Sequence, residues 1–217
     1  MALKKWDKAA ICLPTVDEAK QLARIIENYD PRLRGCFGVI DGQLFALEKN
    51  ERDSIQCTYY NGMDLIHAVK QVTVFGANGT ILAALTNAPG SFHDSYCLIL
   101  QGLFRKLEQY PDNLYLATDT AFPANPHIRR KLTENELETL PIAQAEFADH
   151  LGSILGTVRC SSEWGNGGMQ KCFKILVTKK LPTRRPLFRR FLLGNLNRLG
   201  NVRTRCMNIN QITNVYT

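Results

Sequence analysis

Hydrophobic residues recur at helical spacing near the start of the chain, over residues 15–29. The apolar positions follow the three- and four-residue spacing of an amphipathic helix. Asp17 and Glu18 fall in its first turn, where the helix dipole favours negative charge. Pro31 stops the pattern, because proline disrupts helical hydrogen bonding. We therefore expect a helix with one face packed against the rest of the protein.

Three strands are expected next. Residues 36–47 are rich in residues that favour β-structure. Residues 65–88 hold two more apolar runs, separated by Ala77-Asn78-Gly79. Asn-Gly supplies the positive φ angles of a tight hairpin turn. The pattern therefore predicts three consecutive antiparallel strands.

After Pro89-Gly90 the chain is expected to alternate between helix and strand. Residues 91–110 place apolar side chains on one helical face, and Ser91 and Asp94 have the spacing of a capping box. Residues 113–119 form a short apolar strand that ends on Asp119. Three further helices are predicted. The first covers residues 133–150, with Thr133 and Glu136 as a capping box. The second begins at residue 160 and runs through three glycines, and the third covers residues 187–199.

Three strands, a helix, a strand and further helices are the element order of the ribonuclease H-like fold. This is an α/β fold with a mixed sheet flanked by helices. In it the first and fourth strands are neighbours, so Asp41 and Asp119 could point into one cleft. A chain of 217 residues with 45% hydrophobic content suits one catalytic domain.

Cysteine usage and hydropathy exclude several protein classes. The seven cysteines are odd in number and include no CxxC pair, so neither a disulfide framework nor a zinc finger is predicted. The sequence shows no signal peptide and no run of roughly 18 apolar residues that would span a membrane. We expect a soluble protein in a reducing compartment, the cytosol or the nucleus.

Basic charge is concentrated in the C-terminal part of the chain. From Arg159 onward there are twelve Lys and Arg residues and a single acid, Glu163, although the whole chain carries only +7. Such a segment suits a polyanion such as DNA, because phosphates neutralised by basic side chains release counterions. A solvated basic face without a partner is the alternative that charge alone leaves open.

Two acids stand out as candidates for chemistry. Asp41 and Asp119 lie beside apolar strand segments, where a lone carboxylate is costly unless it is paired or bound to a cation. A turn or capping role is the structural alternative for each. His93 could face the same cleft, although a histidine beside a helix cap is more often a surface residue. Trp164 is expected in the core rather than stacked on a base.

Four motifs, taken together, carry a family resemblance. They are GVIDGQ (38–43), PGSFHDS (89–95), ATDTAFP (117–123) and RCSSEWGNGGMQKCF (159–173). In this order they resemble the catalytic domain of PIF/Harbinger-type transposases and their domesticated nuclease relatives, within the DDE superfamily. The likeness runs from about Gly35 to the C-terminus. It implies a lead-in at 1–34, a DDE nuclease core at 35–178 and a basic helical extension packed on the core at 179–217.

The resemblance implies a metal-dependent DNA endonuclease. Asp41, Asp119 and Glu163 would be its catalytic triad and would hold two Mg²⁺ or Mn²⁺ ions for phosphodiester hydrolysis and strand transfer. His93 and Asp94 are candidates for a supporting role around the triad. The basic residues expected to contact the DNA backbone are Lys171, Lys174, Lys179, Lys180, Arg184 and Arg185.

Two other functions remain open at this point. The chain could be a catalytically inactive, transposase-derived scaffold that binds DNA or protein, or a ribonuclease H-like nuclease acting on RNA or RNA–DNA hybrids. PIF/Harbinger-type transposases carry a helix-turn-helix-like region ahead of the core, whereas only 40 residues precede Asp41 here. We therefore expect DNA and a Myb-like DNA-binding protein as partners, no membrane association, and a nuclear location after import from the cytoplasm. An oligomer is compatible with the sequence.

Overall fold

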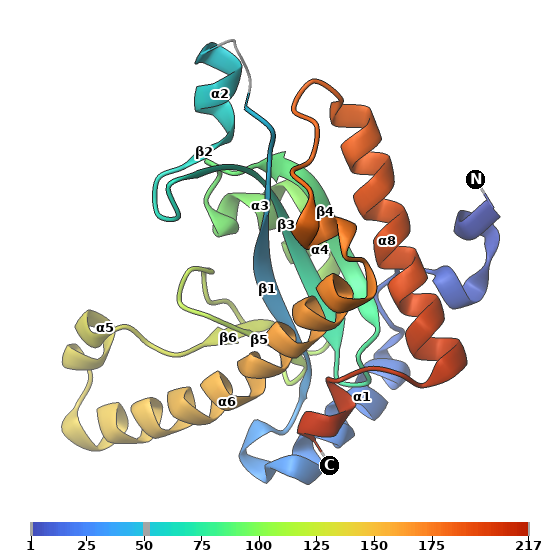
Figure 1. Cartoon of the computed structure of the whole chain (residues 1–217). Coiled ribbons are helices and arrows are strands. Elements are labelled where there is room, and N and C mark those ends of the chain that lie inside the picture. Colours follow the sequence, from blue (N-terminus) through green and yellow to red (C-terminus); the bar gives the residue numbers. More distant parts are fainter. Residues whose placement is uncertain (1, 50–52, 217) are drawn as a thin grey trace.

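The computed structural model describes residues 2–49 and 53–216. Within these residues six strands form one mixed sheet (Figure 1). Their bounds are β1 (Cys36–Ala46), β2 (Tyr60–Asn61), β3 (Ile66–Gly76), β4 (Ile81–Pro89), β5 (Tyr115–Thr118) and β6 (Ile128–Arg130). β3 pairs antiparallel with β1, β2 and β4, while β1 pairs parallel with β5, and β5 with β6. This arrangement confirms the predicted α/β class and is compatible with a ribonuclease H-like fold.

Helices cover both faces of this sheet (Figure 1). The α-helices are α1 (Val16–Tyr29), α2 (Asp53–Tyr59), α3 (Asp94–Gln101), α4 (Leu103–Leu107), α5 (Glu134–Glu138), α6 (Ile142–Cys172), α7 (Ile175–Thr178) and α8 (Pro186–Met207). Short 3-10 helices are η1 (Ala2–Lys5), η2 (Asp7–Ala9), η3 (Pro31–Leu33) and η4 (Thr213–Val215). Asp41 on β1 contacts α6, whereas the next residue, Gly42, faces α3. Since successive strand residues point to opposite faces, α6 and α3 lie on opposite sides of the sheet.

Two groups of buried apolar side chains hold the layers together. The larger joins the sheet to α1, α3, α4 and α6, and includes Ile26, Ile40, Val74, Leu98 and Leu155. A smaller group lies between the sheet and the C-terminal helices, and consists of Phe45, Leu47, Val69, Leu176, Leu181, Leu193 and Leu196. In the part of the chain that the structure describes, no helix is both long and apolar enough to cross a lipid bilayer.

The predicted first helix and hairpin are confirmed. Thr15 caps α1 and forms a capping box with Glu18. The turn between β3 and β4 contains Gly79 with φ of +78°, and the Gly79 N–H donates to the carbonyl oxygen of Gly76. The turn differs from the prediction at Asn78, whose φ is not positive. Its side-chain oxygen instead accepts from the Thr80 N–H at 3.1 Å.

The predicted helix over residues 91–110 is two helices. Gly102 adopts the left-handed conformation with φ of +63° and separates α3 from α4. The predicted capping box of Ser91 and Asp94 is wrong. His93 caps α3, because its side chain accepts from the Ser95 N–H, whereas the Ser91 hydroxyl donates to the carbonyl oxygen of Thr58.

The third helical region also differs from the prediction. Thr133 and Glu136 do form a capping box, but the helix they cap, α5, has only five residues. After Pro141 a single helix, α6, runs for 31 residues through the segment where the sequence predicted a break. It passes through Gly165, which lies so close to the Phe75 ring and Ile212 that a Cβ would not fit without a shift. Tertiary packing therefore outweighs the low helix propensity of glycine here.

Helix α8 follows the predicted apolar spacing but buries a largely polar face. Leu187 and Phe191 are 81% and 65% exposed. Arg189, Asn197 and Asn201 are buried and face the sheet. The Asn201 side chain accepts from the N–H of Ile81 at 2.7 Å and donates to its carbonyl oxygen at 2.9 Å. Helix α8 is thus fixed to β4 by directional hydrogen bonds as well as by apolar contacts.

Candidate metal centre

One carboxylate, Asp41, lies on β1, and a second, Asp119, directly follows the neighbouring parallel strand β5. In the register of β1 and β5, Val39 is opposite Ala117, and two residues further along the chain come Asp41 and Asp119. The Thr118 hydroxyl donates to the carbonyl oxygen of Ile40 at 3.2 Å and ties the strands together just before the two acids. The expectation that the first and fourth predicted strands are neighbours is confirmed.

Asp41 occupies an environment that disfavours its ionised form. Burial raises the pKa of its carboxyl to about 6, and the negative charge of Asp119 acts in the same direction. The Ser162 hydroxyl and the positive charge of Arg159, both on α6, lower that pKa but do not offset burial. The positive charge near Asp41 is therefore too small to stabilise its ionised carboxylate fully.

Asp119 follows directly after the end of β5 and is half-buried. One of its oxygens accepts from the backbone N–H of Ala121 at 2.9 Å, so the turn after the strand fixes the carboxylate. This contact resembles a turn role, which the sequence left open for Asp119. Within the described residues no hydrogen bond reaches the second carboxylate oxygen, which leaves it available to a ligand.

Glu163 lies on α6 but does not join the other two acids. Its side chain is 59% exposed and forms an ion pair with Arg159, one turn earlier, at 3.0 Å. Within residues 2–49 and 53–216, no three His, Cys, Asp or Glu side chains are close enough together to hold a metal ion. The structure thus brings Asp41 and Asp119 together, whereas Glu163 is paired with Arg159 instead.

Sequence reasoning missed a neighbour of Asp41 on the same helix. The side-chain N–H of Asn166 donates to Asp41 Oδ2 at 2.9 Å. Arg159, Ser162 and Asn166 recur at intervals of three and four residues, so they share one face of α6. That spacing was available in the sequence. It went unused because the predicted helix began at residue 160 and its facing side was not known.

His93 and Asp94 are not placed beside Asp41. The His93 ring caps α3 and lies 2.8 Å from the Ser95 hydroxyl oxygen. Asp94 forms an ion pair with Lys70 at 2.6 Å and lies against Gly42, on the sheet face opposite Asp41. These contacts support the local fold of α3 and β3.

The six predicted DNA-binding residues are all exposed. They lie at the end of α6, around α7 and in the segment that leads into α8. Leu181 in this segment forms a β-bridge with Leu47, directly after β1. The basic segment therefore runs beside the end of the strand that carries Asp41.

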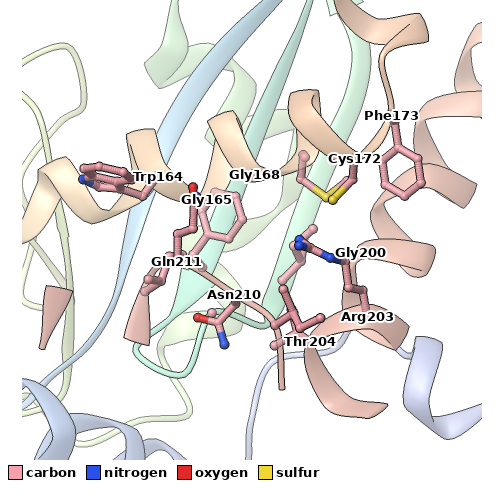
Figure 2. Close-up of a pocket in the computed structure, with 16 residues that line it drawn as sticks. Trp164, Gly165, Gly168, Cys172, Phe173, Gly200, Arg203, Thr204, Asn210 and Gln211 are labelled. Atoms are coloured by element: carbon pink, nitrogen blue, oxygen red, sulfur yellow. The ribbon is translucent and has the colours of Figure 1, made fainter. Parts of the chain in front are cut away.

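A small cavity lies where α6, α8 and the C-terminal segment meet. Figure 2 shows its lining, which includes Gly165, Gly168 and Cys172 of α6, Gly200 and Arg203 of α8, and Asn210 and Gln211 beyond α8. Its volume of about 30 Å³ suits roughly two water molecules and no nucleotide. Trp164 is at its rim and 52% exposed, so the prediction of a core position for this residue is wrong. The next residue, Gly165, makes the close contacts with Phe75 and Ile212 in the core.

The family of this chain is shown by one family model that matches most of its length. A family model described as DDE superfamily endonuclease matches residues 40–210, more than half of the chain. The matched stretch contains Asp41, Asp119 and Glu163, and runs from β1 through α8. The chain belongs to the DDE superfamily endonucleases. This family consists of transposase-type nucleases, and membership in it implies a DNA substrate.

Other comparisons added no relative. No curated protein and no solved structure matched the chain. For this DDE superfamily endonuclease, the match confirms the superfamily that the four motifs indicated. The assignment to PIF/Harbinger-type transposases stays a prediction.

Proposed function

We propose that this DDE superfamily endonuclease cleaves DNA by a two-metal mechanism at the acids Asp41, Asp119 and Glu163. The observation that carries the proposal is the Asp41–Asp119 pair. Asp41 on β1 and Asp119 just after β5 lie at the same level of two adjacent strands, and burial together with the negative charge of Asp119 raises the pKa of Asp41 to about 6. A divalent cation would offset that cost, since it is the charge the pair lacks.

The available donors fit Mg²⁺ or Mn²⁺. Carboxylate oxygens are hard ligands, which these ions prefer over softer metals. Asp41, Asp119 and Glu163 would hold the two ions. Bound ions would activate a water and stabilise the charge that develops on the attacking and leaving oxygens.

Glu163 and Arg159 would change partners on binding. The Glu163 side chain is exposed, and in the described part of the chain it is held by an ion pair within one helix, an interaction worth little in water. Rotation of that side chain toward Asp41 would release the Arg159 guanidinium. Arg159 already acts on the Asp41 charge, so the released side chain could bind a phosphate at the same place.

DNA would approach along the basic segment. The basic side chains are exposed and lie at the end of the helix that presents Glu163 or after it. They are Lys171, Lys174, Lys179, Lys180, Arg184 and Arg185. Contacts from these side chains to phosphates position the backbone without reading sequence. The same site would catalyse strand transfer with a 3′ hydroxyl in place of water. The four motifs support a PIF/Harbinger-type enzyme that acts in the nucleus with a Myb-like DNA-binding partner.

A plasmid-nicking assay in Mn²⁺ tests the proposal. We expect the parent to convert supercoiled plasmid to the nicked form. Asp41→Asn, Asp119→Asn and Glu163→Gln keep the shape of each side chain and remove its charge, so each should slow nicking by at least about 100-fold. Asp64→Asn changes an exposed aspartate on the loop before β3 and should nick at the parental rate.

Equal nicking by the parent and the three site variants would refute the assignment. Nicking that is lost in Asp41→Asn and Asp119→Asn but kept in Glu163→Gln would confine the site to the first two acids. A parent that binds plasmid but does not nick it, with or without Mn²⁺, would instead support a scaffold without activity.

A further inference from the structure

Asn166 is the most unusual polar side chain near the two acids. It is only 7% exposed. Its Nδ2 donates to Asp41 Oδ2 at 2.9 Å, yet its Oδ1 is buried and has no hydrogen-bond partner in the described part of the chain. Buried amide oxygens are nearly always paired, so an orphaned one beside a carboxylate pair calls for an explanation.

The position of Asn166 is fixed by the packing of α6. The preceding residue, Gly165, lies against the Phe75 ring and Ile212, which brings the helix backbone close to the sheet. The Ser161 hydroxyl is 2.8 Å from the Tyr216 hydroxyl and anchors the same stretch of helix to the C-terminal segment. These contacts hold Asn166 against β1.

A second amide oxygen on the same sheet face is also without a partner. Gln43 lies two residues after Asp41 on β1, so both side chains project to the α6 side of the sheet. Its Oε1 is buried and unpaired. The face that carries Asp41 thus holds two buried acceptors that no described donor satisfies.

We propose that Asn166 is a metal ligand of this centre, through Oδ1. A half-turn of the amide exchanges its nitrogen and oxygen, so Oδ1 would take the place from which Nδ2 now contacts Asp41. Adjacent oxygens around one Mg²⁺ at 2.0–2.1 Å are roughly 3 Å apart. The 2.9 Å between the Asn166 amide and Asp41 Oδ2 matches that spacing.

This inference rests on the proposed function and sharpens it. Of the three predicted acids the structure brings together two, and the side chain that α6 directs at Asp41 is Asn166 rather than Glu163. Asp41, Asp119 and Asn166 would then supply three hard oxygen donors. Glu163, three residues earlier on α6, would add its oxygen when it leaves Arg159.

Isothermal titration of Mn²⁺ into the full chain, without DNA, tests the inference. The informative pair is Asn166→Asp and Asn166→Leu. Aspartate supplies an oxygen but has no N–H to donate to Asp41, whereas leucine supplies neither. We expect Asn166→Asp to bind Mn²⁺ at least as tightly as the parent, and Asn166→Leu to bind at least 10-fold more weakly. Asn195→Leu, on α8, should bind like the parent.

The outcomes separate this inference from the proposed function. Equal weakening by Asn166→Asp and Asn166→Leu would mean that Asn166 acts as a hydrogen-bond donor, and would overturn the inference. Parental binding that Asp119→Ala abolishes but Asn166→Leu leaves intact would also overturn it, while the proposed function stands. A parent that binds no Mn²⁺ would overturn both. Thermal unfolding in EDTA identifies any variant that fails to fold, and Asn166→Ala then takes the place of Asn166→Leu.

Discussion

At the scale of single residues, Asp41 combines a structural cost with a chemical role. Its carboxyl is packed between β1 and α6, and the pKa is raised to about 6 from the ordinary value of 3.8. Between about pH 4 and pH 6 the folded protein therefore keeps a proton on Asp41 that the unfolded chain has lost. In the absence of metal, ionisation of Asp41 works against folding.

The sign of this effect gives a prediction. Between about pH 4 and pH 6 the folded state binds more protons at Asp41 than the unfolded state, so stability falls as pH rises through this window. Asp41→Asn removes the titration. In EDTA we expect the variant to match the parent near pH 4 and to exceed its free energy of unfolding by up to roughly 3 kcal/mol above pH 7.

Urea unfolding at a series of pH values measures this difference. Asp64→Asn, an exposed aspartate changed in the same way, is the control. Mn²⁺ should reverse the order above pH 7, because it stabilises only a chain that binds it. A stability difference that stays flat from pH 4 to pH 8 would contradict the role of burial.

The two acids on strands were predictable and the partner on the helix was not. An acid beside an apolar strand is visible in sequence, and strand order alone places Asp41 next to Asp119. Which residues of a helix face the sheet depends on its rotation about its axis. In this structure Asn166 contacts Asp41, whereas Glu163, three residues earlier on the same helix, is paired with Arg159.

At the scale of elements, α6 shows that glycine content alone does not decide where a helix ends. The helix tolerates Gly165, Gly167 and Gly168 because the surrounding chain holds it in place. These glycines differ in what surrounds them. A Cβ on Gly165 would lie 2.9 Å from Ile212 and 3.0 Å from the Phe75 ring, whereas a Cβ on Gly167 would meet nothing within 4 Å.

Alanine at these two positions should have opposite effects. Gly167→Ala gains helix propensity without a clash and should raise the free energy of unfolding by roughly 0.5–1 kcal/mol. Gly165→Ala gains the same propensity but overpacks the contact with Phe75, at a cost of about 1–3 kcal/mol, so we expect a net loss. Urea unfolding compares the two variants with the parent. A gain in both would show that the contact at Gly165 relaxes freely.

The breaks between helices were harder to predict than their presence. Apolar spacing alone carries through residues 91–110, yet Gly102 interrupts the helix there by adopting a positive φ. The C-terminal helix was predicted from Leu187, Phe191 and their neighbours, although its buried face carries Arg189. Periodicity finds a helix, but the face that packs is decided by tertiary hydrogen bonds.

At the scale of the whole molecule, Arg189 connects separate parts of the fold. It is fully buried and donates to the side chain of Asn87 and to the carbonyl oxygens of Pro182 and Thr183. A further contact reaches the Tyr59 hydroxyl at 3.0 Å. One guanidinium therefore joins α2, β4 and the segment before α8.

Arg189→Ala should be strongly destabilising. The change leaves several buried acceptors unpaired, and each costs about 1–3 kcal/mol, so we expect a loss of at least about 3 kcal/mol. Thermal or urea unfolding provides the measurement. Arg190→Ala, which changes the exposed neighbour, should stay within about 0.5 kcal/mol of the parent. Similar losses in both variants would argue for a general effect of charge on α8.

The overall architecture was the most predictable level. Local sequence patterns predict the order of strands and helices, and the preference of α/β folds for right-handed connections leaves few ways to arrange them. The contacts that lock the sheet to α8 were not predictable in this way. They join residues far apart in the chain through side-chain amides, such as the pair formed by Gln71 and Asn197.

Because Asn201 lies near the C-terminus, its hydrogen bonds to earlier parts of the chain form late in synthesis. Asn201 contacts Ile81 at a separation of 120 residues, and its Nδ2 reaches the carbonyl oxygen of Ala10 at a separation of 191. Until the ribosome has released α8, the first residue of β4 lacks these partners, and the edge of the sheet is open to other chains. Synthesis on polysomes therefore places this open edge close to other nascent chains.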